Sequence, residues 1–117
     1  MGSPRLLDSQ LQKGTTPMLV LAVIGEGELY GYQIAAQIRE RSGGTFDPSE
    51  GSLYPVLHRL EADGALSATW RDSERGPRRR YYRLSAGGHR LLQESVAQWA
   101  AFASGIARVA TPEPSRG

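Results

Sequence analysis

The sequence predicts a mainly α-helical chain with one small β-hairpin, a fold of the α+β class. Three short segments carry apolar residues at helical spacing, and glycines separate them. Two short runs rich in Thr, Trp and Tyr then flank a turn-rich connector, as in a hairpin. A long final segment repeats apolar residues at alternating intervals of three and four. A chain of 117 residues has room for these elements in one domain plus one extra helix.

Composition excludes several classes of protein. With 39% hydrophobic and 22% charged residues, the chain has the composition of an ordinary soluble domain. The longest apolar stretch, residues 17–25, is far shorter than the ~20 residues that cross a bilayer, so we expect no signal peptide, no membrane partner and a cytoplasmic location. The absence of cysteine excludes disulfides and thiolate zinc sites. No catalytic constellation, phosphate-binding loop or pair of neighbouring histidines is present, so we expect no enzyme activity, cofactor or metal site.

The first firm helix is predicted to begin at Thr16, a favoured N-cap residue, with Pro17 at the first helical position. Residues 18–24 are almost entirely apolar, which predicts a helix buried on nearly all sides and ended by Gly25. Upstream, residues 1–14 are polar with scattered leucines. They are predicted to form an N-terminal arm or a short helix.

Two further helices follow. The second is predicted from about residue 30 to residue 41, with the glycines at 43–44 as its stop. The third begins at residues 47–50, Asp-Pro-Ser-Glu, which supply a cap, a helix-starting proline and an acid three residues after the cap. Gly64 ends this helix. Its apolar residues fall on one stripe at helical spacing: Leu53, Val56, Leu57 and Leu60.

The predicted hairpin joins strands at 66–71 and 79–84 through a charged connector. Residues 71–83 hold six arginines against two acids, a local charge of +4 (six minus two). Such a cluster is the electrostatic footprint of a surface that meets phosphates. The alternative is a solvated, arginine-rich loop.

The last helix is predicted from about Ser85 to residue 110, and the tail at 111–117 is expected to be disordered. The apolar residues of this last helix form a seam along one side, as in a coiled coil. A chain this short offers no second helix that could cover the seam. A second subunit is the natural partner, so the sequence predicts a homodimer. The seam consists of Leu92, Val96, Trp99, Ala103, Ile106 and Ala110.

Three helices followed by a hairpin is the order of a winged helix-turn-helix, in which the third helix enters the major groove of DNA. The face opposite the apolar stripe is suited to that role, because small residues permit close approach and hydroxyls and arginine bind phosphates or bases. Glycine and proline in a short helix cost ~1 and ~3 kcal/mol, which indicates selection for something other than helix stability. This face comprises Gly51, Ser52, Tyr54, Pro55, His58 and Arg59.

Individually these residues have simpler explanations. Tyr54 fits the edge of the core, and His58 fits an ordinary exposed histidine. Arg59 could pair with Asp63 four residues later. The face is therefore informative as a group.

Three motifs resemble the signatures of the PadR family of transcriptional regulators: LYGYQI at 29–34, GSLYPVLHRLE at 51–61 and GPRRRYYRL at 76–84. The resemblance spans roughly residues 13–90. With one C-terminal dimerisation helix, the chain is similar to the short subgroup. This implies a homodimeric repressor that binds double-stranded DNA at an inverted-repeat operator and is released by a small molecule or another signal.

The resemblance also assigns roles to residues. It implies that Tyr32 contacts phosphate, and it places Ser52, Tyr54, Pro55 and Arg59 on the recognition helix and Arg78, Arg79 and Tyr81 at the wing. From the first turn and exposed face of the third helix and from the basic connector, Ser49, His58 and Arg75 complete the predicted DNA-binding set.

A tryptophan on the final helix suggests an effector site. Trp99 lies on the seam between Val96 and Ala103, near several small residues, and a two-fold partner would bring two indoles together. Indole faces suit planar apolar or cationic molecules. The alternative is that Trp99 only packs the dimer core.

The sequence thus predicts a DNA-binding domain at 15–85 and a dimerisation helix at 86–110. Two other functions stay open: a winged-helix module that binds protein instead of DNA, and a ligand-binding dimer without specific DNA recognition.

Overall fold

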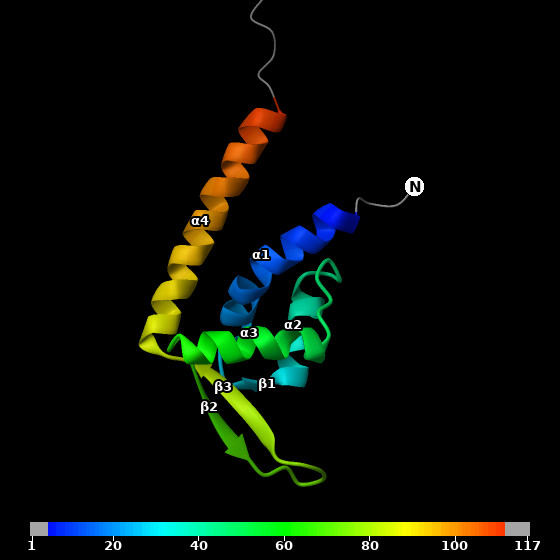
Figure 1. Cartoon of the computed structure of the whole chain (residues 1–117), viewed down its shortest axis with the longest axis vertical. Coiled ribbons are helices and arrows are strands. Elements are labelled where there is room, and N and C mark those ends of the chain that lie inside the picture. Colours follow the sequence, from blue (N-terminus) through cyan, green and yellow to red (C-terminus); the bar gives the residue numbers. More distant parts are fainter. Residues whose placement is uncertain (1–4, 112–117) are drawn as a thin grey trace, which may run out of the picture.

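The structure is a computed structural model that describes residues 5–111, and side chains from residue 14 onward. Figure 1 shows the fold predicted from the sequence, a winged helix-turn-helix followed by a long C-terminal helix. The elements are α1 (Arg5–Ile24), β1 (Leu29–Tyr30), α2 (Gly31–Arg41), α3 (Glu50–Ala62), β2 (Leu66–Arg71), β3 (Arg79–Leu84) and α4 (Ala86–Ala110). Residues 112–117 of the predicted tail lie outside the described residues.

Helix α1 corrects the expectation for the N-terminus. It runs without a break from Arg5 to Ile24 with Pro17 inside it, so the prediction of a helix start at Thr16 is wrong. Interior proline costs ~3 kcal/mol. Packing overrides that local signal, because Thr15 is buried and the following turns form part of the core.

The start of α3 also differs from the prediction. Ser49 is the N-cap, and its hydroxyl oxygen accepts from the Ser52 amide at 3.1 Å, so the proposed cap at Asp47 and the capping box with Glu50 are wrong. Serine caps as well as aspartate does, and Pro48 is left in the preceding loop. Glu50 becomes the first helical residue, where the helix dipole favours a carboxylate.

The sheet has three strands in the order β1-β3-β2, all antiparallel. The hairpin strands have the predicted bounds, whereas β1 was missed because two residues are too short to show alternation. In the hairpin, Trp70 lies opposite Arg80 and Arg71 lies opposite Arg79. The hairpin, hereafter the wing, extends away from the body on the side opposite α4 (Figure 1).

One hydrophobic core joins α1, α2, α3 and the sheet. The predicted stripe of α3 faces it, with three leucines buried and Val56 half-buried. Tyr82 of β3 is almost fully buried and identifies the sheet face that packs on the helices. The core consists of Val20, Leu21, Val23, Ile24, Leu29, Ile34, Ala35, Ile38, Leu53, Leu57, Leu60, Ala65, Leu66 and Tyr82.

Helix α4 is fixed to the body at its first turn. Ser85 caps it by accepting from the Gly88 amide at 3.0 Å, and the same hydroxyl donates to the Gly64 carbonyl at 2.6 Å. A Cβ added at Gly88 would lie 2.1 Å from the Ala65 carbonyl oxygen, so only glycine permits this close approach. Beyond this anchor, α4 projects away from the body (Figure 1).

Candidate nucleic-acid interface

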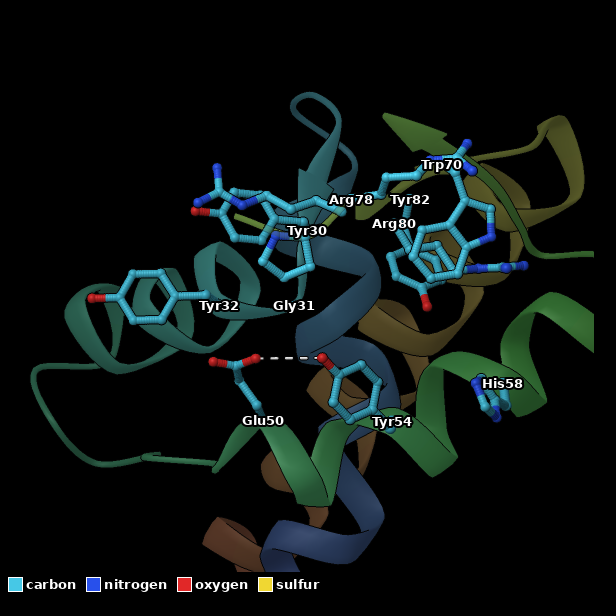
Figure 2. A pocket seen from close by; sticks show the side chains of 12 residues that line it. Tyr30, Gly31, Tyr32, Glu50, Tyr54, His58, Trp70, Arg78, Arg80 and Tyr82 are labelled. Atoms are coloured by element: carbon cyan, nitrogen blue, oxygen red, sulfur yellow. Dashed lines mark hydrogen bonds between the residues drawn. The ribbon is translucent and has the colours of Figure 1, made fainter. Parts of the chain in front are cut away.

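A cavity of about 690 Å³ lies between α3 and the wing. Figure 2 shows the aromatic rings and guanidinium groups that surround it, together with Glu50. Arginines bind phosphates and base edges, and exposed rings pack against sugars and bases, so this lining is suited to a nucleic acid. The lining residues are Tyr30, Gly31, Tyr32, Glu50, Tyr54, His58, Trp70, Pro77, Arg78, Arg79, Arg80 and Tyr82.

The exposed face of α3 spans two sides of the helix. Tyr54 and His58 line the cavity next to the wing. Pro55 and Arg59 line a second groove, of about 350 Å³, next to Pro17 of α1. The predicted face is therefore exposed as a group, and its two edges lie beside different elements.

The simpler explanation for Arg59 does not hold. Among the side chains that the structure describes, residues 14–111, Arg59 takes part in none of the ion pairs, and Asp63 pairs with none of the cations. Tyr54 is 43% exposed and lines the cavity, so its ring is accessible even though it lies beside the core. Both side chains are thus presented outward.

The two serines at the start of α3 are engaged within the helix itself. The Ser49 hydroxyl caps the helix, as described above. The Ser52 hydroxyl donates to the Ser49 carbonyl oxygen at 2.9 Å. Both residues are exposed, so they lie on the predicted surface with their hydroxyls already bonded to backbone.

Glu50 and Tyr54 form a pair at the cavity wall. The Tyr54 hydroxyl donates to Oε2 of Glu50 at 3.4 Å (Figure 2). Burial and the neighbouring carboxylate raise the pKa of Tyr54 above its ordinary value, so its hydroxyl stays protonated near neutral pH and acts as a donor. A Cβ at Gly31 would lie 3.4 Å from the Tyr54 hydroxyl, in ordinary van der Waals contact, so the start of α2 lies directly beside this pair.

A second aromatic group lies where α2 begins. Tyr30 and Tyr32 stack with ring centres 6.5 Å apart, and Tyr32 is 60% exposed. The guanidinium carbon of Arg79 lies 4.5 Å from the Tyr30 ring centre. This contact holds the Arg79 side chain beside Tyr32 at the cavity. Tyr81 contacts Tyr30 edge-on at 5.3 Å and does not line the cavity.

The residues that shape the inner side of the wing were not predicted from the sequence. Trp70 is 53% exposed, and Arg80 and Arg78 lie 5.5 and 5.9 Å from its ring centre. Arg80 also pairs with Glu61 of α3, which ties the wing to the helix. The alternation of β2 and β3 could have shown that Trp70 and Arg80 share a face with Tyr82.

Arg78 and Arg75, two of the arginines predicted to bind DNA, are both exposed but have different surroundings. Arg78 forms an exposed ion pair with Asp72 at 3.4 Å. Arg75 is exposed in the connector and lies outside the cavity lining.

The predicted seam of α4 is divided by the structure. Leu92 packs against the core of its own chain, whereas Val96, Trp99 and Ile106 are exposed and Ala103 is half-buried. Phe102 and Val109, which the sequence analysis did not include, are exposed as well.

Trp99 borders a cavity of about 350 Å³ between α1 and α4. Its ring centre is 5.9 Å from that of Phe102. The cavity is lined by Gly14, Pro17, Met18, Ser95, Gln98, Trp99 and Phe102.

The part of the chain that the structure describes holds no cluster of three or more His, Asp or Glu side chains able to bind a metal ion. No helix among the described residues is long and apolar enough to span a membrane.

Comparison with known proteins agrees with this architecture. The profile of the transcriptional regulator PadR-like family matches residues 20–94, more than half of the chain. A transcriptional regulator of Mycobacterium tuberculosis is 34% identical over 85 residues, 73% of this chain and 76% of that protein.

Solved structures show the same fold. A PadR family transcriptional regulator of Eggerthella lenta superposes with a TM-score of 0.81 at 29% identity over 93% of both chains. Bacillus subtilis PadR, solved in complex with operator DNA, gives a TM-score of 0.65 at 22% identity over 70% of this chain and 46% of that one. The chain therefore belongs to the PadR-like family of transcriptional regulators and is not an enzyme.

Proposed function

We propose that this regulator is a homodimeric repressor that binds an inverted-repeat operator in double-stranded DNA. Helix α3 would enter the major groove, and the wing would contact the adjacent backbone or minor groove. The observation that carries the proposal is the cavity between α3 and the wing, because it combines an exposed helix face with guanidinium groups. The sugar-phosphate backbone that separates the major groove from the minor groove would pass through this cavity.

The distribution of ion pairs supports a phosphate partner. Away from the cavity, Arg41 pairs with Glu26 and Arg71 with Glu28, so acids of the same chain offset these charges. At the cavity, Arg78 and Arg80 pair with Asp72 and Glu61, but Arg79 takes part in none of the ion pairs formed by the described side chains, and neither does Arg59 on α3. Unpaired cations beside the recognition helix attract the DNA backbone.

The DNA contacts of the individual residues are part of this proposal. Tyr32 and Arg79 would bind phosphate next to the start of α2, and Arg78 would do so from the wing. Tyr54, Pro55, His58 and Arg59 would face the bases or backbone from α3. The remaining contacts would come from Ser49, Ser52, Arg75 and Tyr81.

The proposed dimer rests on α4. Its exposed apolar residues form a face that a second copy would cover, so residues 15–85 would bind DNA and residues 86–110 would dimerise. The operator complex of Bacillus subtilis PadR supports DNA as the partner of the fold. A protein with this partner would work in the cytoplasm.

We propose release by a planar apolar or cationic molecule that stacks on Trp99. The cavity beside Trp99 lies between α1 and α4, so a ligand there would contact both the body and the dimerisation helix. Val96 and Ala103 do not line this cavity, so they would reach the ligand only in the proposed dimer, where the Trp99 of the second copy would lie close to the same site. Titration with a planar cationic dye should quench tryptophan fluorescence, and Trp99→Phe should abolish that response. Quenching lost in Trp70→Phe and kept in Trp99→Phe would contradict this site.

The function is tested by the salt dependence of DNA binding. Fluorescence anisotropy of labelled DNA from upstream of the gene should show affinity that falls linearly with salt on logarithmic axes. Arg79→Ala should reduce the slope by about one per lost phosphate contact, hence about two for a dimer. Arg108→Ala on α4 is the matched control and should keep the wild-type slope. Absence of DNA binding at low salt would favour a protein-interaction module instead.

A further inference from the structure

Glu50 is a carboxylate on a surface otherwise suited to phosphates. It is the first residue of α3, it is exposed, and it lines the cavity beside three arginines. It takes part in none of the ion pairs among the described side chains, residues 14–111. A carboxylate facing phosphate oxygens would weaken DNA binding through repulsion. The helix dipole accounts for a carboxylate at the start of α3, but it leaves open what this carboxylate meets when DNA occupies the cavity.

Glu50 carries the carboxylate in the first turn of α3, and it accepts a hydrogen bond there from Tyr54. The hydroxyls of Ser49 and Ser52 are bonded to backbone within the turn. Only Oε2 of Glu50 accepts a hydrogen bond, from Tyr54, and that contact fixes the direction of the carboxylate. Among the described side chains, none donates a hydrogen bond to Oε1 of this cavity-lining residue.

The position within the helix favours base contact. Residues at the N-terminal end of a recognition helix contact base edges in the major groove. The amines that a carboxylate can accept from there are N4 of cytosine and N6 of adenine. Adenine presents the N7 acceptor beside its amine, which repels a carboxylate, whereas cytosine offers its amine without that neighbour.

We infer that Glu50 accepts a hydrogen bond from the N4 amine of a cytosine in each operator half-site, and that Tyr54 is its positioning residue. This inference rests on the proposed function and names one base that the site prefers. It also explains how a negative charge is compatible with the interface: the carboxylate would meet a base amine, while Arg78 and Arg79 meet phosphates.

A purely structural role makes a different prediction. The Glu50 carboxylate lies near Gly31, the first residue of α2, where a negative charge interacts favourably with the helix dipole. If that were its whole role, substitution would change stability and leave base preference unchanged.

The test is selection of bound duplexes from a randomised DNA library by the full chain. Wild type should select cytosine at one position of each half-site. Glu50→Gln should reduce the preference for cytosine at least about fivefold and shift it toward adenine, because a carboxamide pairs with N6 and N7 of adenine. Tyr54→Phe should weaken the cytosine preference without the shift to adenine. Glu74→Gln removes the same charge from the wing connector and should leave the selected sequence unchanged.

Two results would overturn the inference in distinguishable ways. If wild type selects a motif and Glu50→Gln selects the same bases with equal discrimination, the role of Glu50 is wrong and the proposed function stands. If wild type selects no sequence at all, both are wrong.

Discussion

The two ends of the molecule differ in how they cover their apolar side chains. In the body, formed by α1 to α3 and the sheet, the apolar stripes face one another and are buried. In the distal half of α4, residues 96–110, the large apolar side chains are between 39% and 85% exposed. Exposed apolar surface of this extent on one helix marks an interaction site. The body thus completes its own core, whereas α4 leaves an apolar face exposed, which the proposed second copy would cover.

The largest expected effect comes from the core. Leu57 of α3 is fully buried in the core of the body, so Leu57→Ala should lower the free energy of unfolding by about 2–5 kcal/mol. Leu91→Ala makes the same truncation on α4 at a residue that is 36% exposed, and it should cost less than about 1 kcal/mol. Urea denaturation measures both. Equal losses would show that the first turns of α4 are packed as tightly as the core of the body, against the exposure of Leu91.

The next effect belongs to the dimer. Ile106→Glu places a charge on the exposed apolar face of α4, and burying it in an interface should cost about 3 kcal/mol, roughly 100-fold in the dimer dissociation constant. Sedimentation over a range of concentrations gives this constant. Ser104→Glu adds the same charge to the other side of the helix and should leave the dimer intact. A monomeric wild type at micromolar concentration would disprove the proposed role of α4.

A smaller effect is expected where the wing meets α3. Glu61 and Arg80 are about one-third exposed, so solvent screens their ion pair, and Glu61→Gln should cost about 1 kcal/mol of stability. The dimer dissociation constant should not change, because this pair lies in the body. Glu40→Gln, an exposed substitution elsewhere on the body, is the control in the same urea titration. A change in dimerisation would show that the two regions are coupled.

The elements that the sequence predicted well are those set by local patterns. The hairpin strands follow from β-branched and aromatic residues around a turn, and α4 follows from Ser85 and a regular seam. The start of α1 was wrong because Pro17 is a local signal that packing overrides. The strand β1 was missed because two residues gain strand character only by pairing with β3.

The residues of the candidate site divide in the same way, into those set by local sequence motifs and those set by contacts between elements. Tyr32, Tyr54, His58, Arg78 and Arg79 came from motifs, and the structure brings them together around one cavity. Glu50, Trp70 and Arg80 were missed because their significance depends on contacts between elements. The hydrogen bond from Tyr54 to Glu50 and the register opposite Trp70 exist only in the folded chain.

The most direct test of the account is a hydroxyl-radical footprint of the wild-type protein on the DNA upstream of its own gene. The account joins a DNA-binding body to a dimerising helix, so it predicts two equivalent protected segments related by an inverted repeat. Their centres should lie one helical turn apart, about 10 base pairs, or a multiple of this distance. Ile106→Glu should lose the paired protection at concentrations where wild type shows it. A single protected segment without symmetry, or no protection at low salt, would contradict the account.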